Sequence, residues 1–288
     1  MNGGDPSAHD YWLHLGRDWL ASDTVRLWRA HVDSVVGEVV ARWLPAGKVG
    51  LALKTDVFEE ASGRGLAWRL IGSAGRVMAI DLSSPLLGAA RARASGLTFV
   101  QADVRTLPLA PASVDLVLST STLDHFASVA ELRGSLRELA RVLRTGGELL
   151  ITLDNVANPL IALRNAMPHP LRIRLGLTPY YVGRSFTPWR LRKELRAVGL
   201  EPRELITLLH CPRAIAIPVA RLLDRRMPGD RGAKRFCAWL GLFEWLGKLP
   251  SRYLTGLFVA ARAVRSETQS RPGSPAAVGR VVNRPTSI

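Results

Sequence analysis

Apolar residues recur along the chain in two alternating patterns, which together predict a parallel sheet with helices between its strands. Short apolar runs, typical of buried strands, occupy residues 49–53, 76–81, 97–102, 114–119 and 148–153. Between them, apolar residues at three- and four-residue steps predict helices over residues 65–71, 86–94 and 129–143. Strands alternating with helices at this spacing favour a parallel sheet covered on both faces.

Two flanking regions extend this core. The first 45 residues are expected to form two helices, the second running from a cap at Ser22 or Asp23 to Trp43. After residue 154 the pattern predicts mostly loop with one short helix (155–188), a helix (188–198), a sixth strand (205–209), a helical insert (211–252) and a seventh strand (254–262). The predicted fold class is therefore α/β: a Rossmann-like, doubly wound sheet of about seven strands, mostly parallel with a final antiparallel strand.

This pattern predicts one domain over residues 1–264, followed by a disordered tail over 265–288 that is dominated by Ser, Pro, Gly and Arg. Within the domain we distinguish N-terminal helices (1–45), a core (46–154) and the elements that follow it (155–252), with the helical insert between strands six and seven.

The charge of the chain is distributed unevenly. Of its 288 residues, 39 are Lys or Arg and 24 are Asp or Glu, a net charge of +15. Residues 1–155 carry 16 basic and 17 acidic side chains, whereas residues 156–288 carry 23 and 7. The excess charge thus indicates an anionic partner for the second half.

Cysteine usage and hydropathy indicate a cytoplasmic protein. Cys211 and Cys237 are too few for a disulfide framework and lack the spacing of a zinc site, so we expect a reducing compartment and no metal. The chain begins without the basic-then-apolar pattern of a signal peptide and has no run of about 18 apolar residues that could span a membrane.

Three acidic residues follow successive strands of the predicted sheet: Asp56, Asp81 and Asp103. Ligands of open α/β sheets bind outside the carboxyl ends of the strands. A carboxylate there can accept hydrogen bonds from ribose hydroxyls, although each acid alone could instead cap a helix. No G-x-G-x-x-G motif follows the first strand, which disfavours a nicotinamide dehydrogenase. Three acids in successive loops favour a ligand that contains a nucleoside.

Four segments are similar to consecutive motifs of class I S-adenosylmethionine-dependent methyltransferases (methyltransferase type 11-like). They are Arg76-Val-Met-Ala-Ile-Asp81, Gln101-Ala-Asp-Val-Arg-Thr-Leu-Pro108, Val114-Asp-Leu-Val-Leu-Ser119 and Arg141-Val-Leu-Arg-Thr-Gly-Gly-Glu-Leu-Leu-Ile151. The resemblance implies that S-adenosylmethionine is the cofactor, with Asp81 and the adjoining Leu82 at its ribose. It also implies adenine contacts from Asp103 and the backbone of Val104. Ser119, with the residues up to 122, would lie along the cofactor.

The loop after the first strand departs from this family. The chain has Lys54-Thr55-Asp56 where the family has an acid and a Gly-rich loop, and its glycines come later, at Gly63 and Gly65. Thr55 and Asp56 could bind the methionine ammonium, with the two glycines opening the next helix. Lys54 could instead reach the methionine carboxylate. A non-catalytic binding protein with a degenerate methyltransferase fold is the alternative interpretation.

Methyl transfer needs alignment and, for a hydroxyl or activated carbon, removal of a proton. His125, just past the fourth strand, is the candidate base because imidazole exchanges protons near neutral pH. Asp124 could assist it. Alternatively, Asp124 caps the next helix and His125 packs beneath the cofactor.

The basic excess falls on segments expected to roof the acceptor site, residues 154–188 and 211–252, which should do so together with the N-terminal helices. Basic residues there (Arg164, Arg172, Arg174, Arg184, Arg213, Arg221, Arg225, Arg226) neighbour apolar ones (179–182, Phe236, Trp239, Leu240, Phe243, Trp245). This pairing fits a small acceptor that is anionic or lipid-like, or peripheral contact with an anionic membrane. Alternatively, the aromatic residues are the insert's own core and the arginines are solvated.

An RNA methyltransferase is a further alternative, but no RNA-binding module is evident and apolar runs interrupt the basic residues, which disfavours nucleic acid. The sequence leaves the oligomeric state open.

Overall fold

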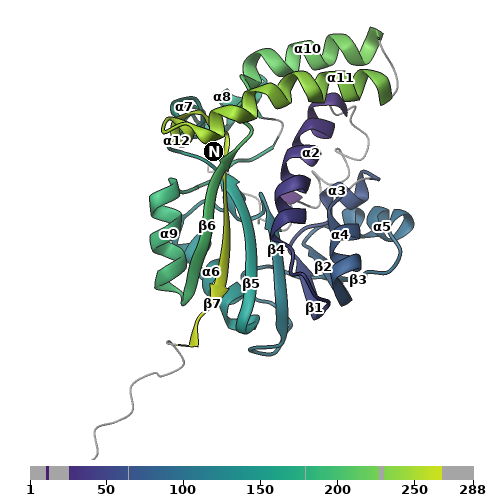
Figure 1. The fold of residues 1–288 in the computed structure, drawn as a ribbon, viewed down its shortest axis with the longest axis vertical. Helices are drawn as coiled ribbons and strands as arrows, with labels where there is room; N and C mark the ends of the chain where they lie inside the picture. Colours follow the sequence, from purple (N-terminus) through teal and green to yellow (C-terminus); the bar gives the residue numbers. More distant parts are fainter. Residues whose placement is uncertain (1–10, 13–25, 64, 179, 227–229, 268–288) are drawn as a thin grey trace, which may run out of the picture.

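The structure is a computed structural model that describes residues 11–12, 26–63, 65–178, 180–226 and 230–267. Its centre is a seven-stranded sheet in the order β3-β2-β1-β4-β5-β7-β6 (Figure 1). The strands are β1 (Val49–Lys54), β2 (Ala74–Asp81), β3 (Thr98–Gln101), β4 (Val114–Thr120), β5 (Leu143–Asp154), β6 (Leu200–Leu208) and β7 (Phe258–Arg265). Neighbouring strands pair in parallel from β3 to β5, and β7 runs antiparallel to both β5 and β6.

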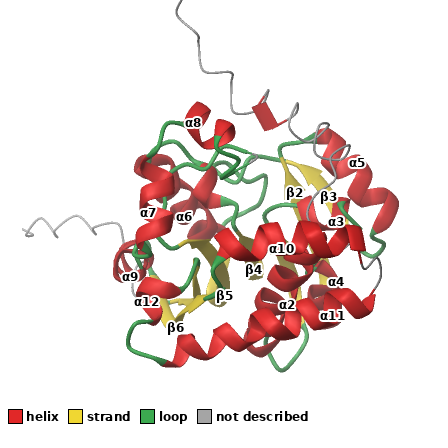
Figure 2. Cartoon of the chain, turned by 90° about the horizontal axis from the view of Figure 1, so that it is seen from above, coloured by secondary structure: helices red, strands yellow, loops and turns green. Residues whose placement is uncertain are grey.

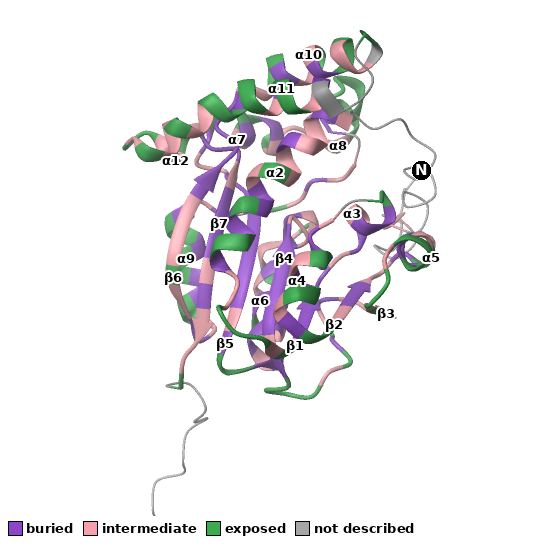
Figure 3. Cartoon of the chain, turned by 45° about the vertical axis from the view of Figure 1, so that its right-hand side comes forward, coloured by how far each residue is buried: buried purple, intermediate pink, exposed green. Residues whose placement is uncertain are grey.

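Helices cover both faces of this sheet, because strand side chains alternate between the faces. Leu53, Val117 and Leu149 share a core with α6 (Val129–Val142) and α9 (Pro188–Ala197). The alternate positions Ala52 and Leu116 pack with α2 (Arg26–Trp43) and α4 (Ala67–Ser73) on the other face. A smaller cluster joins β2 to α3 (Phe58–Ala61) and α5 (Ser84–Arg93). Figure 3 shows the burial that results along the central strands.

Further helices gather over the carboxyl ends of the parallel strands (Figures 1 and 2). They are α7 (Pro159–Ala166), α8 (His169–Arg174), α10 (Arg213–Arg226), α11 (Asp230–Gly241) and α12 (Arg252–Thr255), with the 3-10 turns η1 (Leu123–His125) and η2 (Leu242–Lys248). Leu27 at the start of α2 packs with Phe236 and Leu240 of α11. The helix α2 therefore contacts both the sheet and the helices above it.

The α/β fold, the seven strands, the antiparallel final strand and the insert between β6 and β7 are confirmed. The prediction of one short helix within residues 155–188 was wrong, because this segment forms two helices, α7 and α8. The side chain of Asn158 caps α7, and Pro159 occupies its first turn. Strand β6 also begins five residues earlier than expected, at Leu200. The first expected N-terminal helix lies mostly outside the described residues, as does the tail from residue 268.

Candidate functional site

A cavity of about 670 Å³ lies at the carboxyl ends of β1, β2 and β4. Helices α2, α8 and α10 each contribute residues to its wall. Seven of the residues expected from the sequence to act together line this one cavity: Thr55, Asp56, Asp81, Leu82, Asp103, Val104 and His125. The fold thus brings together side chains that are up to 70 residues apart in the chain.

Asp81, at the end of β2, is held by backbone amides. Its Oδ2 accepts a hydrogen bond from Val57 N at 3.1 Å, and its Oδ1 accepts one from Ser83 N at 2.8 Å. Burial raises the pKa of this carboxyl, an effect that these hydrogen bonds and the positive charge of Lys54 partly oppose. Each carboxylate oxygen has a further lone pair, so Asp81 can still accept hydrogen bonds from a ligand.

Asp103, after β3, forms a fork-shaped ion pair with Arg105. Its Oδ2 accepts from Nε of Arg105 at 2.9 Å and from Nη2 at 2.7 Å. Arg105 also donates to Oε1 of Glu131 at 2.9 Å, and the bonds to Asp103 raise the pKa of the guanidinium. A ligand donor at Asp103 would therefore share its carboxylate with Arg105.

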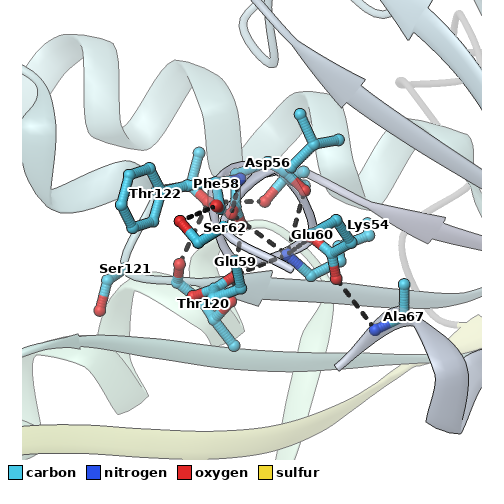
Figure 4. Close-up of polar contacts among 12 residues, drawn as sticks. Lys54, Asp56, Phe58, Glu59, Glu60, Ser62, Ala67, Thr120, Ser121 and Thr122 are labelled. Carbon is cyan, nitrogen blue, oxygen red and sulfur yellow. Dashed lines mark hydrogen bonds and ion pairs between the residues drawn. The ribbon is translucent and has the colours of Figure 1, made fainter. Parts of the chain in front are cut away.

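The loop after β1 is organised around a buried lysine (Figure 4). Lys54 is fully buried, and its Nζ lies 3.1 Å from Oδ1 of Asp56, 2.8 Å from Oε2 of Glu59 and 3.1 Å from Oε2 of Glu60. Burial alone would lower the pKa of Lys54, but the three carboxylates raise it well above its usual value. The expectation that Lys54 reaches a cofactor carboxylate was wrong, because this ammonium does not line the cavity.

The same three acids have the spacing of a cation site, with ligand atoms within 4.8 Å of one another. The Lys54 ammonium lies at hydrogen-bond distance from this group and supplies a positive charge there. Two of the acids, Asp56 and Glu59, also line the cavity. Thr122 donates to Oδ2 of Asp56 at 3.4 Å, which ties the loop after β1 to the loop after β4.

The structure does not bring Gly63, Gly65 or Ser119 to the wall of the cavity. Both glycines have positive φ, 77° and 126°, and turn the chain between α3 and α4. A Cβ on Gly65 would collide with the carboxylate of Glu60, so this glycine permits a close approach to an acid instead of to a ligand. Ser119 is fully buried behind the wall, where its Oγ accepts a hydrogen bond from Thr55 at 3.0 Å.

His125 lines the cavity with one ring nitrogen already engaged. Its Nδ1 lies 2.9 Å from the carbonyl oxygen of Tyr181. A carbonyl only accepts, so Nδ1 carries the proton, and Nε2 holds the lone pair in the neutral ring. This tautomer is the one that a base acting through Nε2 requires.

Asp124 lies behind His125 and does not line the main cavity. Its Oδ2 accepts from Asp154 N at 3.0 Å, whereas its buried Oδ1 has no hydrogen-bond partner among the described residues and lies 4.0 Å from Nε2 of His125. Burial raises the pKa of Asp124 to about 6, although the charge of His125 opposes this rise. Asp124 and His125 share an adjoining cavity of about 30 Å³.

The basic residues above the sheet fall into three groups. Arg164 and Arg172 are buried and bonded, to Asp154 and to the Val182 carbonyl. Arg213 and Arg221 line the cavity. A third group of these arginines is exposed: Arg174, Arg184 and Arg226.

The aromatic residues of the insert divide in a similar way. Phe236 is buried in the insert's own core, whereas Trp239 and Trp245 are 39% and 57% exposed. Some of the basic and aromatic side chains are therefore buried in the fold, whereas others are exposed or line the cavity.

The sequence placed the N-terminal helices over the site but singled out none of the α2 residues that line the cavity wall. Trp28, Arg29, Val32 and Asp33 all line it. The three- and four-residue spacing of Trp28 and Val32 was visible in the sequence, but the same spacing describes a helix packed on a sheet.

The comparisons with known proteins agree with this geometry. A family model described as a methyltransferase domain matches residues 58–151. A probable S-adenosylmethionine-dependent methyltransferase of Mycobacterium tuberculosis is 35% identical over 101 residues, which cover 35% of this chain and 36% of that protein. A malonyl-[acyl-carrier protein] O-methyltransferase of Xylella fastidiosa is 30% identical over 211 residues, 68% of each chain.

The solved structures show the same fold. A chain of the Haloferax volcanii complex between the Trm112 methyltransferase activator and its methyltransferase partner superposes with a TM-score of 0.55 at 19% identity. The match covers 91% of this chain and 100% of that chain.

This chain therefore belongs to the class I S-adenosylmethionine-dependent methyltransferases. The region of this chain that aligns with the Mycobacterium tuberculosis relatives covers only about a third of their length.

Proposed function

We propose that this chain binds S-adenosylmethionine in the cavity of about 670 Å³ and transfers its methyl group to a small organic acceptor. The observation that carries the proposal is the convergence of Asp56, Asp81 and Asp103 on one cavity from the ends of successive strands, next to His125. When bound, the cofactor supplies a sulfonium-activated methyl group.

Each wall residue has a proposed contact with the cofactor. Asp81 accepts hydrogen bonds from the ribose hydroxyls with the lone pairs that Val57 and Ser83 leave free. Leu82 packs beside the ribose. Asp103 and the backbone of Val104 bind the adenine. Asp56 and Thr55 bind the methionine ammonium, and Ser119 acts indirectly through its hydrogen bond with Thr55.

His125 is the proposed base for an acceptor that must lose a proton. The proton moves from the acceptor atom to Nε2 while Nδ1 keeps its hydrogen bond to Tyr181. The ring then carries a positive charge, and the Asp124 carboxylate at 4.0 Å stabilises it. Asp124 thus positions the His125 ring and stabilises its charged form, and it does not contact the acceptor because it does not line the main cavity.

The acceptor is proposed to combine an apolar body with an anionic group. Apolar side chains from several elements line the cavity, among them Ile161, Ile173, Leu177, Ile217, Leu257 and Phe258, and Arg213 lies among them. The Xylella fastidiosa relative is named for a malonyl group, which carries a carboxylate, and this supports an anionic acceptor.

We also propose peripheral contact with an anionic bilayer. In the described residues no helix has the length and apolar character needed to cross a membrane. However, Leu160 and Leu163 of α7 are 68% and 59% exposed, and Leu175 beside α8 is 56% exposed. The neighbouring Ile161 and Ile173 face the cavity, so an acceptor dissolved in the bilayer would meet the site directly.

Calorimetric titration with S-adenosylhomocysteine tests the cofactor site. We expect saturable binding that Asp81→Asn weakens at least tenfold, because the amide replaces one acceptor oxygen with a donor. Glu201→Gln, at a half-buried acid on β6 outside the cavity, is the control and keeps the wild-type affinity. Equal affinity in Asp81→Asn contradicts the site, and the absence of any binding heat supports the non-catalytic alternative.

Incubation with labelled cofactor and a cell extract tests the acceptor class. A labelled small molecule supports the proposal, and label that ribonuclease removes supports an RNA acceptor instead. With the acceptor identified, His125→Gln should keep S-adenosylhomocysteine affinity while lowering turnover about 100-fold or more. Full turnover in that variant would assign His125 to packing.

A further inference from the structure

Arg213 is a cationic side chain to which none of the described residues presents a hydrogen-bond acceptor or a carboxylate. It is the first residue of α10 and lines both the main cavity and the adjoining cavity of about 30 Å³. Its side chain is half-buried. The buried arginines of this region, Arg164 and Arg172, have a carboxylate and a carbonyl as partners. Within the described part of the chain Arg213 forms no hydrogen bond or ion pair, and its guanidinium instead lies 5.8 Å from the ring centroid of Trp28.

A half-buried guanidinium in this position can gain from a bound anion. Burial lowers the pKa of Arg213, and the charge of Arg164 lowers it further, while Tyr180 and Asp154 oppose these effects from a distance. A guanidinium stays protonated throughout the physiological range, so the side chain keeps its charge and its donors regardless. Partly desolvated donors without acceptors gain most from a ligand that brings oxygen atoms.

One face of α10 carries both cationic and apolar side chains that line the cavity. Arg213, Ile217 and Arg221 are four residues apart, lie on the same side of the helix, and all line the cavity. The adjacent side of the helix packs Ala216 and Ala220 into the core of the insert. The helix thus presents a cation, an apolar side chain and a second cation to the cavity.

We propose that Arg213 binds a carboxylate or phosphate group of the acceptor and that Ile217 packs against the acceptor's apolar body. This inference rests on the proposed methyl-transfer function and names the class of acceptor it takes: an amphiphile with one anionic group. Arg213 and His125 both line the main cavity, so an anion bound by Arg213 there shares that cavity with the proposed base. Arg221 is exposed and lies about 12 Å further along the helix axis, where it attracts the anion as the acceptor enters.

The test uses amphiphiles that share one eight-carbon chain. Octyl phosphate, octanoate and octanol are titrated calorimetrically into the full chain saturated with S-adenosylhomocysteine. We expect the two anions to bind at least tenfold more tightly than octanol, and their rank tells a phosphate site from a carboxylate site. Arg213→Met should weaken binding of the preferred anion at least tenfold without changing octanol binding. Arg226→Met, an exposed arginine of α10 outside the cavity, is the matched control and leaves both unchanged.

Two results would overturn the inference: equal affinity of octanol and the anions, or unchanged anion affinity in Arg213→Met. Arg213→Gln is the second variant, because it keeps a polar side chain if the methionine variant does not fold. Salt dependence of the wild type gives a third measurement, since an ionic contact predicts weaker octyl phosphate binding as sodium chloride rises. Normal S-adenosylhomocysteine binding with no anion preference refutes only the anion site, whereas loss of all cofactor binding by the wild type refutes the proposed function.

Discussion

Lys54 donates a hydrogen bond of 3.1 Å to Oδ1 of Asp56, so a fully buried ammonium lies directly behind a carboxylate that lines the cavity. Lys54 ends β1 and Asp56 lies in the loop that follows, where the related methyltransferase motifs have an acid and a Gly-rich loop. Glu59 and Glu60 complete the contacts of the ammonium. The charges of this loop are therefore coupled to one another before any ligand binds.

Lys54→Met should be among the most destabilising single changes in the chain. It leaves three carboxylates close together with no cation, and breaking a buried ion pair from one side costs about 3–5 kcal/mol. In the wild type, the pKa of Lys54 is raised, so its ion pairs stabilise the folded protein fully at pH values below the ordinary lysine pKa. This stabilisation is lost as the pH rises through the folded-state pKa of Lys54. Urea unfolding measures the loss.

The variant should also regain stability as the pH falls, because protonation removes the repulsion among the three acids. Lys48→Met, at an exposed lysine before β1, is the control and should change the free energy of unfolding little. A stable, pH-insensitive Lys54→Met protein would show that the ammonium does not hold this loop together.

Asp124→Asn should stabilise the protein at neutral pH. The folded-state pKa of about 6 exceeds the ordinary value of 3.8, so the ionised carboxylate destabilises the folded state above pH 6. Two pKa units correspond to at most about 3 kcal/mol. The asparagine oxygen can still accept from Asp154 N, so we expect a gain of about 1–3 kcal/mol at pH 7.5 that disappears near pH 4.

Urea unfolding at pH 7.5, 6.0 and 4.5 measures this pH dependence. Glu201→Gln, whose wild-type carboxyl has its pKa lowered by the hydrogen bond from Arg196, should show no gain at pH 7.5. A constant effect of Asp124→Asn at every pH would argue against the titration of this residue.

Gly65→Ala and Gly134→Ala should have opposite effects. Gly65 has φ of 126°, and a Cβ there meets the carboxylate of Glu60, so alanine should cost about 2 kcal/mol or more. Gly134 lies in α6 with open space around its Cβ position, so alanine should stabilise by up to about 1 kcal/mol. Thermal unfolding of the two variants distinguishes them, and equal shifts would contradict the role given to Gly65.

The double variant Leu160→Glu/Leu163→Glu should weaken binding to anionic vesicles. Both side chains are exposed on α7, and added carboxylates lose apolar contact and repel phosphatidylglycerol. We expect at least fivefold less protein to sediment with vesicles of phosphatidylglycerol and phosphatidylcholine. Trp68→Glu, on α4, is the control at another exposed apolar residue. Equal sedimentation with purely neutral vesicles would contradict the electrostatic part of the proposal.

The sequence predicted the parallel part of the sheet well because each of β1 to β5 contains an apolar run with a recognisable end. The start of β6 was missed because its first residues, 200–204, are mostly polar. It also placed Asp56, Asp81 and Asp103 at one edge, since parallel strands end on the same side. The contacts of Lys54 could not be predicted, because they depend on side chains that meet only after α3 turns back over β1. The same holds for Gly65, whose close neighbour Glu60 becomes visible only in three dimensions.

The position of β7 between β5 and β6 has a consequence for biosynthesis. Asp154 of β5 pairs with Phe258 of β7, so the strand that ends next to the cavity acquires its neighbour only after about a hundred further residues have been made. A nascent chain that stops before β7 leaves the edge of β5 unpaired and β6 without a partner. Nearly the whole domain must therefore leave the ribosome before β7 can pair with β5 and β6. Only then are helices α10 and α11, which lie between β6 and β7 in the chain, anchored at both ends.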